Sequence, residues 1–235
     1  MTPSREQNED CAAVLHVESQ AGVADPWEAA YVRFETPEQE VRKFVRRLKK
    51  LRIDRLPRDA RIVELFCGRG NGLHALSRLG FTHLEGVDLS SRLVAMYRGP
   101  AQCYVGDCRK LPFSNKSRDL LIVQGGLHHL PKLPEDLSQT FAEMHRVLRE
   151  DGRLVVVEPW RTPFLRLVHP ISEIRLVRRC SPKLDALATM THYERVTYEQ
   201  WLSQPGLILK LAREHFSPLR EFFAWGKWMC VGTPL

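Results

Sequence analysis

Apolar positions follow two different spacings along the 235-residue chain. Between residues 41 and 51, apolar side chains recur every three or four positions, which is typical of a helix with one buried face. From Ile62 to Leu65 they stand close together, which favours a short buried strand. The helical spacing then returns in Leu73, Leu76 and Leu79. Because a turn rich in glycine joins this strand to this helix, the pattern predicts the first unit of an open α/β sheet.

The turn between the predicted strand and helix carries three glycines, at residues 68, 70 and 72. Glycine lets the backbone turn sharply and approach a ligand closely. A dinucleotide-binding fingerprint needs a third glycine where this chain has Leu73, and a phosphate-binding P-loop needs a Gly-Lys-Ser/Thr sequence that is absent here. Glu64 ends the strand and places a negative charge beside the loop. The turn therefore favours a ligand with an amino-acid group over one with phosphates.

On these residues the chain resembles class I S-adenosylmethionine-dependent methyltransferases of the broad group that modifies small molecules (methyltransferase type 11-like). Their first motif reads acidic-x-Gly-x-Gly-x-Gly, and Phe66 stands here where the first glycine is expected. We expect Phe66 to narrow the loop or to add an apolar wall. The resemblance implies S-adenosylmethionine as cofactor, S-adenosylhomocysteine as product, and a cofactor-binding first loop made of Glu64, Phe66, Cys67, Gly68 and Gly70.

Two further acidic residues follow predicted strands. The resemblance implies that Asp88 binds the ribose hydroxyls and that Leu89 lies against the adenine. An alternative is that Asp88 only caps the next helix, a role that Ser90 could share. The resemblance also implies that Asp107 faces the adenine amino group and that the amide of Cys108 bonds a ring nitrogen. The alternative for Asp107 is an ordinary turn acid after a strand.

A fourth predicted strand, residues 118–124, runs into a turn rich in glycine, and the resemblance assigns Gln124 and Gly125 to the cofactor. His128 and His129 follow at the expected pocket edge. Because histidine titrates near neutral pH, we expect one of them to contact the substrate or to remove its proton. The alternative is that His129 packs below the cofactor or caps the turn. Weaker candidates for this role are Glu158, His169, His192 and Tyr193.

The ordered motifs cover residues 60–160 and imply the fold. We predict an α/β, Rossmann-like, seven-stranded and mostly parallel sheet with helices on both faces, an N-terminal helical cover and a helical insertion after the fifth strand. The divisions are a flexible N-terminus (1–25), a helical cover (26–59) and a methyltransferase domain (60–235) with a substrate-side insertion at about 161–200. We expect residues 229–232 to be a strand that closes the sheet, and the last aromatic residues to lie in the core, namely Phe222, Phe223, Trp225 and Trp228.

Related enzymes bind their substrate with the N-terminal cover and with the segment after the fifth strand. The resemblance therefore implies substrate contacts from Tyr31, Trp160, His169 and Tyr193. For Tyr31, plain helix packing is an alternative. No pair of the six cysteines has the Cys-x-x-Cys spacing of a zinc site, so we expect neither a metal nor a disulfide framework.

The formal net charge is +7, and the excess of positive charge is local. Ten basic residues lie between Arg42 and Arg61, opposed only by Asp54 and Asp59. This run predicts either a solvated helix surface or a face that attracts nucleic acid, anionic lipid or an acidic substrate. A second basic cluster in the insertion favours an anionic group, and its members are Arg161, Arg166, Arg175, Arg178, Arg179 and Lys183.

The chain has no apolar run long enough for a transmembrane helix, and its first 25 residues are polar without an apolar secretory core. We therefore expect a cytoplasmic enzyme with reduced thiols. The oligomeric state is not predicted.

The function we expect is O-, N- or C-methylation of a small-molecule acceptor, one with an acidic or aromatic part. Enzymes that methylate amines of nucleic-acid bases carry an Asn/Asp-Pro-Pro-Tyr-like motif after the fourth strand, where this chain reads Gln124-Gly125-Gly126-Leu127. Two alternatives remain open. One is an RNA or tRNA methyltransferase that uses the basic N-terminal face, and the other is a non-catalytic S-adenosylmethionine-binding protein. Leu73 disfavours a nicotinamide-dependent enzyme.

Overall fold

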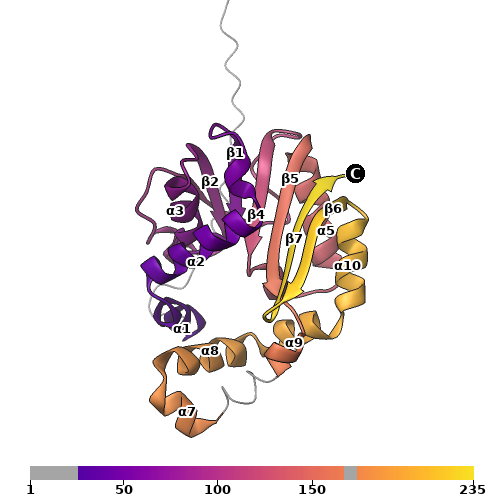
Figure 1. The fold of residues 1–235 in the computed structure, drawn as a ribbon. Helices are drawn as coiled ribbons and strands as arrows, with labels where there is room; N and C mark the ends of the chain where they lie inside the picture. The colour runs from indigo at the N-terminus through magenta and orange to yellow at the C-terminus, as the bar shows by residue number, and fades with distance from the viewer. Residues whose placement is uncertain (1–25, 167–173) are drawn as a thin grey trace, which may run out of the picture.

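A seven-stranded sheet runs through the protein in the order β3-β2-β1-β4-β5-β7-β6 (Figure 1). The structure is a computed structural model that describes residues 26–166 and 174–235. Strands β1 to β5 pair in parallel, and β7 runs antiparallel to both β5 and β6. The strands are β1 (Arg61–Leu65), β2 (His83–Asp88), β3 (Gln102–Val105), β4 (Arg118–Gln124), β5 (Leu148–Pro159), β6 (Phe216–Ala224) and β7 (Lys227–Pro234).

The strand order reverses between β1 and β4, and in open α/β sheets a ligand binds at such a point, beyond the carboxyl ends of the strands. This architecture confirms the predicted fold class. Residues 1–25, which we predicted to be flexible, lie outside the described residues.

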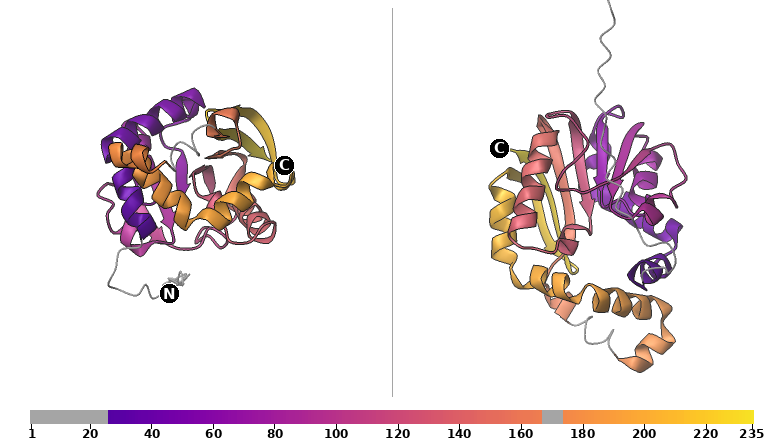
Figure 2. Two further views of the ribbon diagram at one scale, coloured as in Figure 1. Left: turned by 90° about the horizontal axis from the view of Figure 1, so that it is seen from below. Right: turned by 180° about the vertical axis from the view of Figure 1, so that it is seen from behind.

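Helices lie on both faces of the sheet and beyond one end of it (Figures 1 and 2). Helices α2 and α3 cover one face, α5 and α10 cover the other, and α1, α7, α8 and α9 lie beyond the carboxyl ends of the parallel strands. The helices are α1 (Pro26–Phe34), α2 (Pro37–Lys50), α3 (Asn71–Arg78), α4 (Ser91–Val94), α5 (Glu135–Val147), α7 (Arg175–Cys180), α8 (Pro182–Tyr193), α9 (Arg195–Ser203) and α10 (Pro205–Arg213), with short 3-10 turns η1 (Ile53–Arg55) and η2 (Leu127–His129). None of the helices in the described part of the chain is long and apolar enough to cross a bilayer.

The apolar face predicted for residues 41–51 is confirmed. Helix α2 begins with a capping box between Thr36 and Gln39, with Pro37 in its first turn. Its apolar side chains pack against α3 and against one face of β1 and β4. The buried ones are Val41, Phe44 and Leu48, together with Leu51 directly after the helix. Burial of this face fixes α2 beside the first loop of the sheet.

Helices α1 and α8, which we call the roof, form a small apolar cluster of their own. Ala30 of α1 packs against Ala186 and Met190 of α8. The indole nitrogen of Trp27 donates a hydrogen bond of 2.8 Å to Glu194 Oε2, at the start of α9. Two segments far apart in the sequence therefore meet over the carboxyl edge of the sheet.

The expectation that the last aromatic residues all lie in the core is wrong for three of them. Trp228 on β7 is buried, but Phe222, Phe223 and Trp225 are 37%, 44% and 75% exposed. The reason is the order of the last two strands: β7 lies between β5 and β6, so β6 is the edge strand. Residues 229–232 accordingly belong to an internal strand of the sheet and do not form its edge.

Candidate functional site

A cavity of about 510 Å³ lies beyond the carboxyl ends of β1, β2 and β4, beneath the roof. It collects most of the residues that the motifs predicted, which come from several strand ends and helices. The predicted residues that line it are Tyr31, Glu64, Phe66, Cys67, Gly68, Asp88, Leu89, Asp107, Cys108, Gln124, Gly125, His129 and Tyr193. Their binding roles stay predictions, but the structure brings them together.

Three of the predicted site residues that the structure describes do not line this cavity. Gly70 caps α3 with a positive φ of 77°, and a Cβ there would overlap the ring of Tyr97, so its place is in the turn. Trp160 packs against Trp228 with ring centres 5.6 Å apart. His128 is buried behind the cavity wall. His169 lies outside the described residues.

Glu64 carries a buried carboxylate oxygen without a partner. Within residues 26–166 and 174–235 its Oε2 accepts no hydrogen bond, while Oε1 accepts one of 3.3 Å from the Gln124 amide. Burial raises the pKa of Glu64 to about 8, against a smaller opposing effect of that hydrogen bond. An unpaired buried carboxyl group is costly unless a cation or a donor completes it. A ligand with an ammonium group fits this place, as the amino-acid end of S-adenosylmethionine requires.

Asp88 ties the first loop to the second strand. It accepts hydrogen bonds from the backbone amides of Gly68 at 2.7 Å and of Ser90 at 2.8 Å. The helix that follows is capped by Ser90, whose hydroxyl accepts from the amide of Leu93. Burial raises the pKa of Asp88 despite its two backbone donors. Ser90 therefore caps the helix in place of Asp88, and the Asp88 carboxylate can still accept hydrogen bonds from a ligand in the cavity.

Asp107 is already engaged with Arg109. The guanidinium binds the carboxylate at 2.6 Å through Nη2, and the amide of Arg109 donates to Oδ1 at 2.8 Å. Burial alone would raise the pKa of Asp107, but the hydrogen bonds from Arg109 outweigh it and hold the pKa below its usual range. A contact with an adenine amino group would share this carboxylate with Arg109.

Phe66 stands in the first loop where the family's motif has glycine, and the structure shows how the loop accommodates it. The residue has a positive φ of 55°, a conformation that glycine normally supplies. Its ring lies over Gly126, where an added Cβ would overlap it. Phe66 therefore forms part of the cavity wall, and the space it needs comes from a glycine in the loop after β4.

A buried ion pair fastens α2 to the first loop. Arg69 Nη2 lies 3.1 Å from Glu40 Oε2, and Asn71 donates a hydrogen bond of 2.5 Å to the same oxygen. Arg69 also donates to the backbone carbonyls of Val32 and Glu35 and lies over the ring of Tyr31. Sequence reasoning missed this clamp because Arg69 looked like an ordinary loop residue.

Arg47 is a second residue that the sequence reading missed. It belongs to the basic run of α2, yet it donates a hydrogen bond of 2.9 Å to Gln124 Oε1 and so supports the amide that contacts Glu64. Burial lowers the pKa of Arg47 to about 10. Its position three residues after the buried Phe44 was the available signal, because residues three apart share a helix face.

Two histidines and two glutamates form a cluster at one wall of the cavity, and of these four His129 and Glu194 line it. Glu158 at the end of β5 accepts from the amides of Gly126 and Leu127 and lies 2.7 Å from His128 Nδ1. Glu194 Oε2 lies 3.2 Å from His129 Nδ1. Burial, and then the charge of His128, lower the pKa of His129 well below its usual value, so its imidazole is neutral. In the neutral tautomer with a proton on Nδ1, which faces Glu194, His129 Nε2 can act as an acceptor.

The same wall contains a set of groups that could hold a metal, since the ligating atoms of His128, His129 and Glu194 lie within 4.8 Å of one another. However, Glu194 Oε2 already accepts a hydrogen bond from Trp27. The cation of Lys227 is also close enough to interact with Glu158 and Glu194, and burial lowers its pKa to about 8. We interpret the cluster as a hydrogen-bond network, in which Glu194 is the acceptor.

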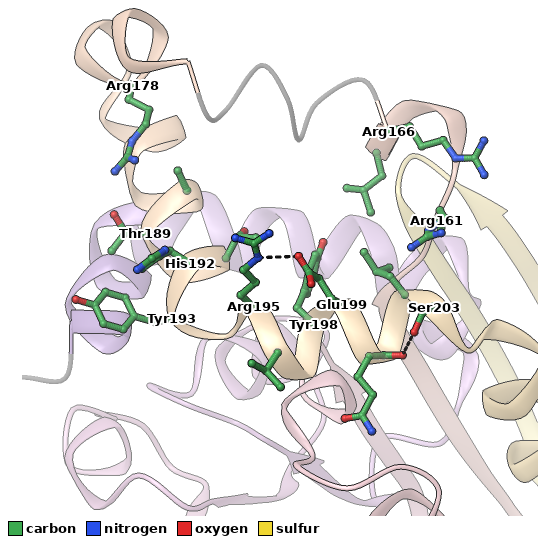
Figure 3. A pocket seen from close by; sticks show the side chains of 16 residues that line it. Arg161, Arg166, Arg178, Thr189, His192, Tyr193, Arg195, Tyr198, Glu199 and Ser203 are labelled. Atoms are coloured by element: carbon green, nitrogen blue, oxygen red, sulfur yellow. Dashed lines mark hydrogen bonds and ion pairs between the residues drawn. The ribbon is translucent and has the colours of Figure 1, made fainter.

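A second cavity, of about 1090 Å³, opens on the outer side of α8 and α9 (Figure 3). Arg161, Arg166, Arg178 and Arg195 line it, and Arg178 and Arg195 are paired with Asp185 and Glu199. Tyr193 lines both cavities, so the two are neighbours across its ring. This arrangement is consistent with the basic cluster that the insertion sequence predicted.

Comparison with known proteins gives the family of the central segment. Residues 63–156 match the family described as Methyltransferase domain (Methyltransf_11). A demethylmenaquinone methyltransferase of Chlorobaculum parvum is 26% identical over 119 residues, 48% of each chain. A phthiotriol/phenolphthiotriol dimycocerosates methyltransferase of Mycobacterium leprae is 35% identical over 104 residues, which are 42% of this chain and 37% of that protein. The chain thus matches about half the length of these curated relatives or less.

Solved structures agree on the fold. The PH0226 protein of Pyrococcus horikoshii superposes with a TM-score of 0.66 at 21% identity, covering 91% of this chain and 100% of the other. An S-adenosylmethionine-dependent methyltransferase of Methanococcus maripaludis gives 0.62 at 12% identity, covering 92% and 97%. Residues 63–156 thus match a methyltransferase domain, and the fold around them is that of solved S-adenosylmethionine-dependent methyltransferases.

Proposed function

We propose that the protein transfers a methyl group from S-adenosylmethionine to a small-molecule acceptor with an apolar, aromatic part. The observation that carries this proposal is the unpaired carboxylate of Glu64 in a cavity that also holds Asp88. The buried Glu64 and the half-buried Asp88, at the carboxyl ends of neighbouring strands, suit a ligand with an ammonium at one end and a ribose at the other.

The cofactor supplies an electrophilic methyl carbon when it is bound, and the residues of the chain provide the surroundings. We assign Glu64 to the ammonium group, Asp88 to the ribose hydroxyls and Asp107 with Cys108 to the adenine. Gln124, held by Arg47, keeps Glu64 in place. Methyl transfer mainly needs alignment of the reactants and exclusion of water, and a cavity covered on one side by the roof supports this activity.

The acceptor class follows from the remaining lining of the cavity. Trp27, Tyr31, Phe44, Phe66 and Tyr193 present aromatic surface to it. Aromatic rings bind flat, apolar molecules through a large contact area. The named relatives act, by their names, on demethylmenaquinone and on phthiotriol or phenolphthiotriol dimycocerosates, which supports an acceptor with a large apolar part.

Proton removal is assigned to His129. Its Nε2 and its position on the cavity wall suit the role of a base toward a hydroxyl or an acidic carbon. Glu194 orients the ring from Nδ1, as a carboxylate does for a catalytic histidine elsewhere. His128 has its Nδ1 bound to Glu158 and supports the wall from behind.

The experiment combines binding with turnover. Calorimetry should show that S-adenosylmethionine and S-adenosylhomocysteine bind and that NAD does not. A panel of reduced naphthoquinones, substituted phenols and long-chain alcohols should then yield S-adenosylhomocysteine with at least one member. Binding of NAD but not of S-adenosylmethionine would contradict the proposal.

The two alternatives give different results in the same experiment. A non-catalytic cofactor-binding protein would bind S-adenosylmethionine tightly and form no S-adenosylhomocysteine with any acceptor. An RNA methyltransferase would form product only with RNA, and its binding in a gel-shift assay would weaken with salt.

A further inference from the structure

The end of the β6–β7 hairpin carries a group of exposed aromatic rings. Trp225 is 75% exposed, and Phe223 and Phe164 are each 44% exposed. The rings of Phe164 and Trp225 meet edge to face, with centres 5.6 Å apart, and we call these three residues the aromatic tip. Most exposed apolar residues stand singly, so a cluster of three large rings needs an explanation.

Trp225 occupies a backbone conformation that does not suit it. Strands β6 and β7 are joined by Trp225 and Gly226, whose φ angles of 53° and 71° are both positive. Such two-residue hairpins favour Asn-Gly, and a bulky side chain with positive φ is strained. The chain therefore keeps an exposed tryptophan where asparagine would be more stable, and strain of this kind is often associated with function.

The tip is held firmly to the segment after β5. The amide of Gly226 donates to Thr162 Oγ1 at 2.9 Å, and the amide of Trp160 donates to the carbonyl of Gly226 at 2.9 Å. The ring of Phe223 packs on Trp160, with centres 5.4 Å apart. The exposed rings are therefore presented by a fixed scaffold at the carboxyl edge of the sheet.

Two arginines flank the aromatic tip. Arg161 and Arg166 stand on either side of Phe164 in the sequence and are exposed. Within the described residues neither forms an ion pair, whereas the neighbouring Arg178 and Arg195 are paired with carboxylates. Arg161 and Arg166 also line the outer cavity (Figure 3). Aromatic rings beside unpaired cations match the boundary between the apolar region and the anionic headgroups of a bilayer.

We propose that the aromatic tip with Arg161 and Arg166 docks the protein onto an anionic lipid surface. The rings enter the interface of the bilayer and the arginines bind the headgroups. The outer cavity lies beside this surface and borders the cofactor cavity at Tyr193. An apolar acceptor could then pass from the lipid to the site, a consequence that rests on the proposed function, whereas docking itself does not.

The test is co-sedimentation of the full chain with vesicles of phosphatidylcholine, with or without phosphatidylglycerol. The wild-type protein should bind the vesicles that contain phosphatidylglycerol. Trp225→Asn with Phe164→Ala should weaken this binding about tenfold, since apolar contact with the interface is lost. Arg161→Gln with Arg166→Gln should abolish the preference for phosphatidylglycerol.

Matched control variants remove positive charges and an exposed apolar side chain from the opposite edge of the sheet. Arg98→Gln with Lys110→Gln removes two charges beside β3, and Met96→Ala removes an exposed apolar side chain there. Both should bind like the wild type. Because asparagine suits the turn, Trp225→Asn should not lower the melting temperature, and calorimetry should show unchanged cofactor binding.

Three results would overturn the docking proposal while leaving methyl transfer intact. In the first, the protein binds equally well to vesicles with and without phosphatidylglycerol. In the second, the variants of the aromatic tip bind vesicles as well as the wild type does. In the third, the protein binds RNA but no vesicles. A dimer that is lost on Trp225→Asn, in a protein that ignores vesicles, would assign the tip to contact between two copies of the chain.

Discussion

The carboxylate of Glu64 lies over the backbone of Gly72, in the space that a side chain at residue 72 would occupy. A Cβ added to Gly72 would overlap Glu64 Oε1. The last glycine of the first loop is therefore required by the acid that precedes the loop, since a larger residue would push that acid out of place.

Gly72→Ala should displace Glu64 and destabilise the protein by about 1–3 kcal/mol, the usual cost of overpacking. It should also weaken binding of S-adenosylmethionine. Urea unfolding and calorimetry measure the two effects. Gly206→Ala is the matched control, because nothing lies within 4 Å of a Cβ at Gly206, and this variant should be as stable as the wild type or more so. Equal stability of both variants would contradict the steric argument.

Asp88→Ala should weaken cofactor binding by roughly 1–3 kcal/mol if its charged hydrogen bonds to the ribose are lost. Part of the effect can come through Gly68, whose amide Asp88 also holds. Asp88→Asn separates the two, since it retains an oxygen for Gly68 but loses the charge. Calorimetry gives the affinities, and the exposed Asp151→Ala is the control. Unchanged affinity in both Asp88 variants would rule out the ribose assignment.

Glu64 should make the cofactor-free protein less stable as the pH rises. Its folded pKa of about 8 lies above the ordinary value of 4.5 for a glutamate, so between these values the folded state binds more protons than the unfolded one. The free energy of unfolding should fall over this range, by at most about 5 kcal/mol for a shift of that size. Glu64→Gln should flatten the curve and stabilise the cofactor-free protein near pH 8, while it weakens binding of S-adenosylmethionine. Urea titrations across the pH range measure this, and parallel curves for both proteins would refute it.

Arg69→Met should cost about 3–5 kcal/mol of stability, because it leaves the buried Glu40 without its cation. Arg69→Met combined with Glu40→Leu should recover much of that loss. Arg78→Gln breaks the exposed pair with Glu38 and should cost less than about 1 kcal/mol. Chemical unfolding of the four proteins decides the matter, and similar losses for Arg69→Met and Arg78→Gln would disprove a buried clamp.

Glu194→Gln should lower the rate of methyl transfer about ten- to a hundredfold, because His129 loses the carboxylate that orients it. Cofactor affinity should change little. Glu199→Gln lies on the same helix, breaks only an exposed pair with Arg195, and should leave the rate unchanged. A ¹⁵N spectrum of His129 should show a proton on Nδ1 in the wild type, and a proton on Nε2 instead would contradict the assigned base.

The sequence predicted the parts of the site that are local. Glu64, Asp88 and Gln124 end parallel strands, and strand ends meet at one edge of a sheet, so the order of the motifs was sufficient to place them together. The buried face of α2 was predicted for the same reason, since helical periodicity is visible in a short window.

The missed residues reach the site through long-range packing. Glu194 belongs to the insertion, and Trp27 reaches it only because α1 packs on α8. No local pattern reports such a contact. The aromatic residues of β6 were misjudged because a run of apolar residues reads the same on an internal strand and on an edge strand, and only the strand order decides which it is.

The pairing of Phe66 with Gly126 has a consequence for how this protein varies. The ring of Phe66 occupies the space that a side chain at Gly126 would need, although the two residues are about sixty positions apart. Neither residue can therefore be replaced alone without a steric cost. Reversing both together, with glycine at the first place and a larger side chain at the second, should be tolerated better than either exchange by itself. Relatives with glycine at the position of Phe66 need not have glycine at position 126. A search that uses the first loop alone will therefore miss chains in which the two positions are exchanged.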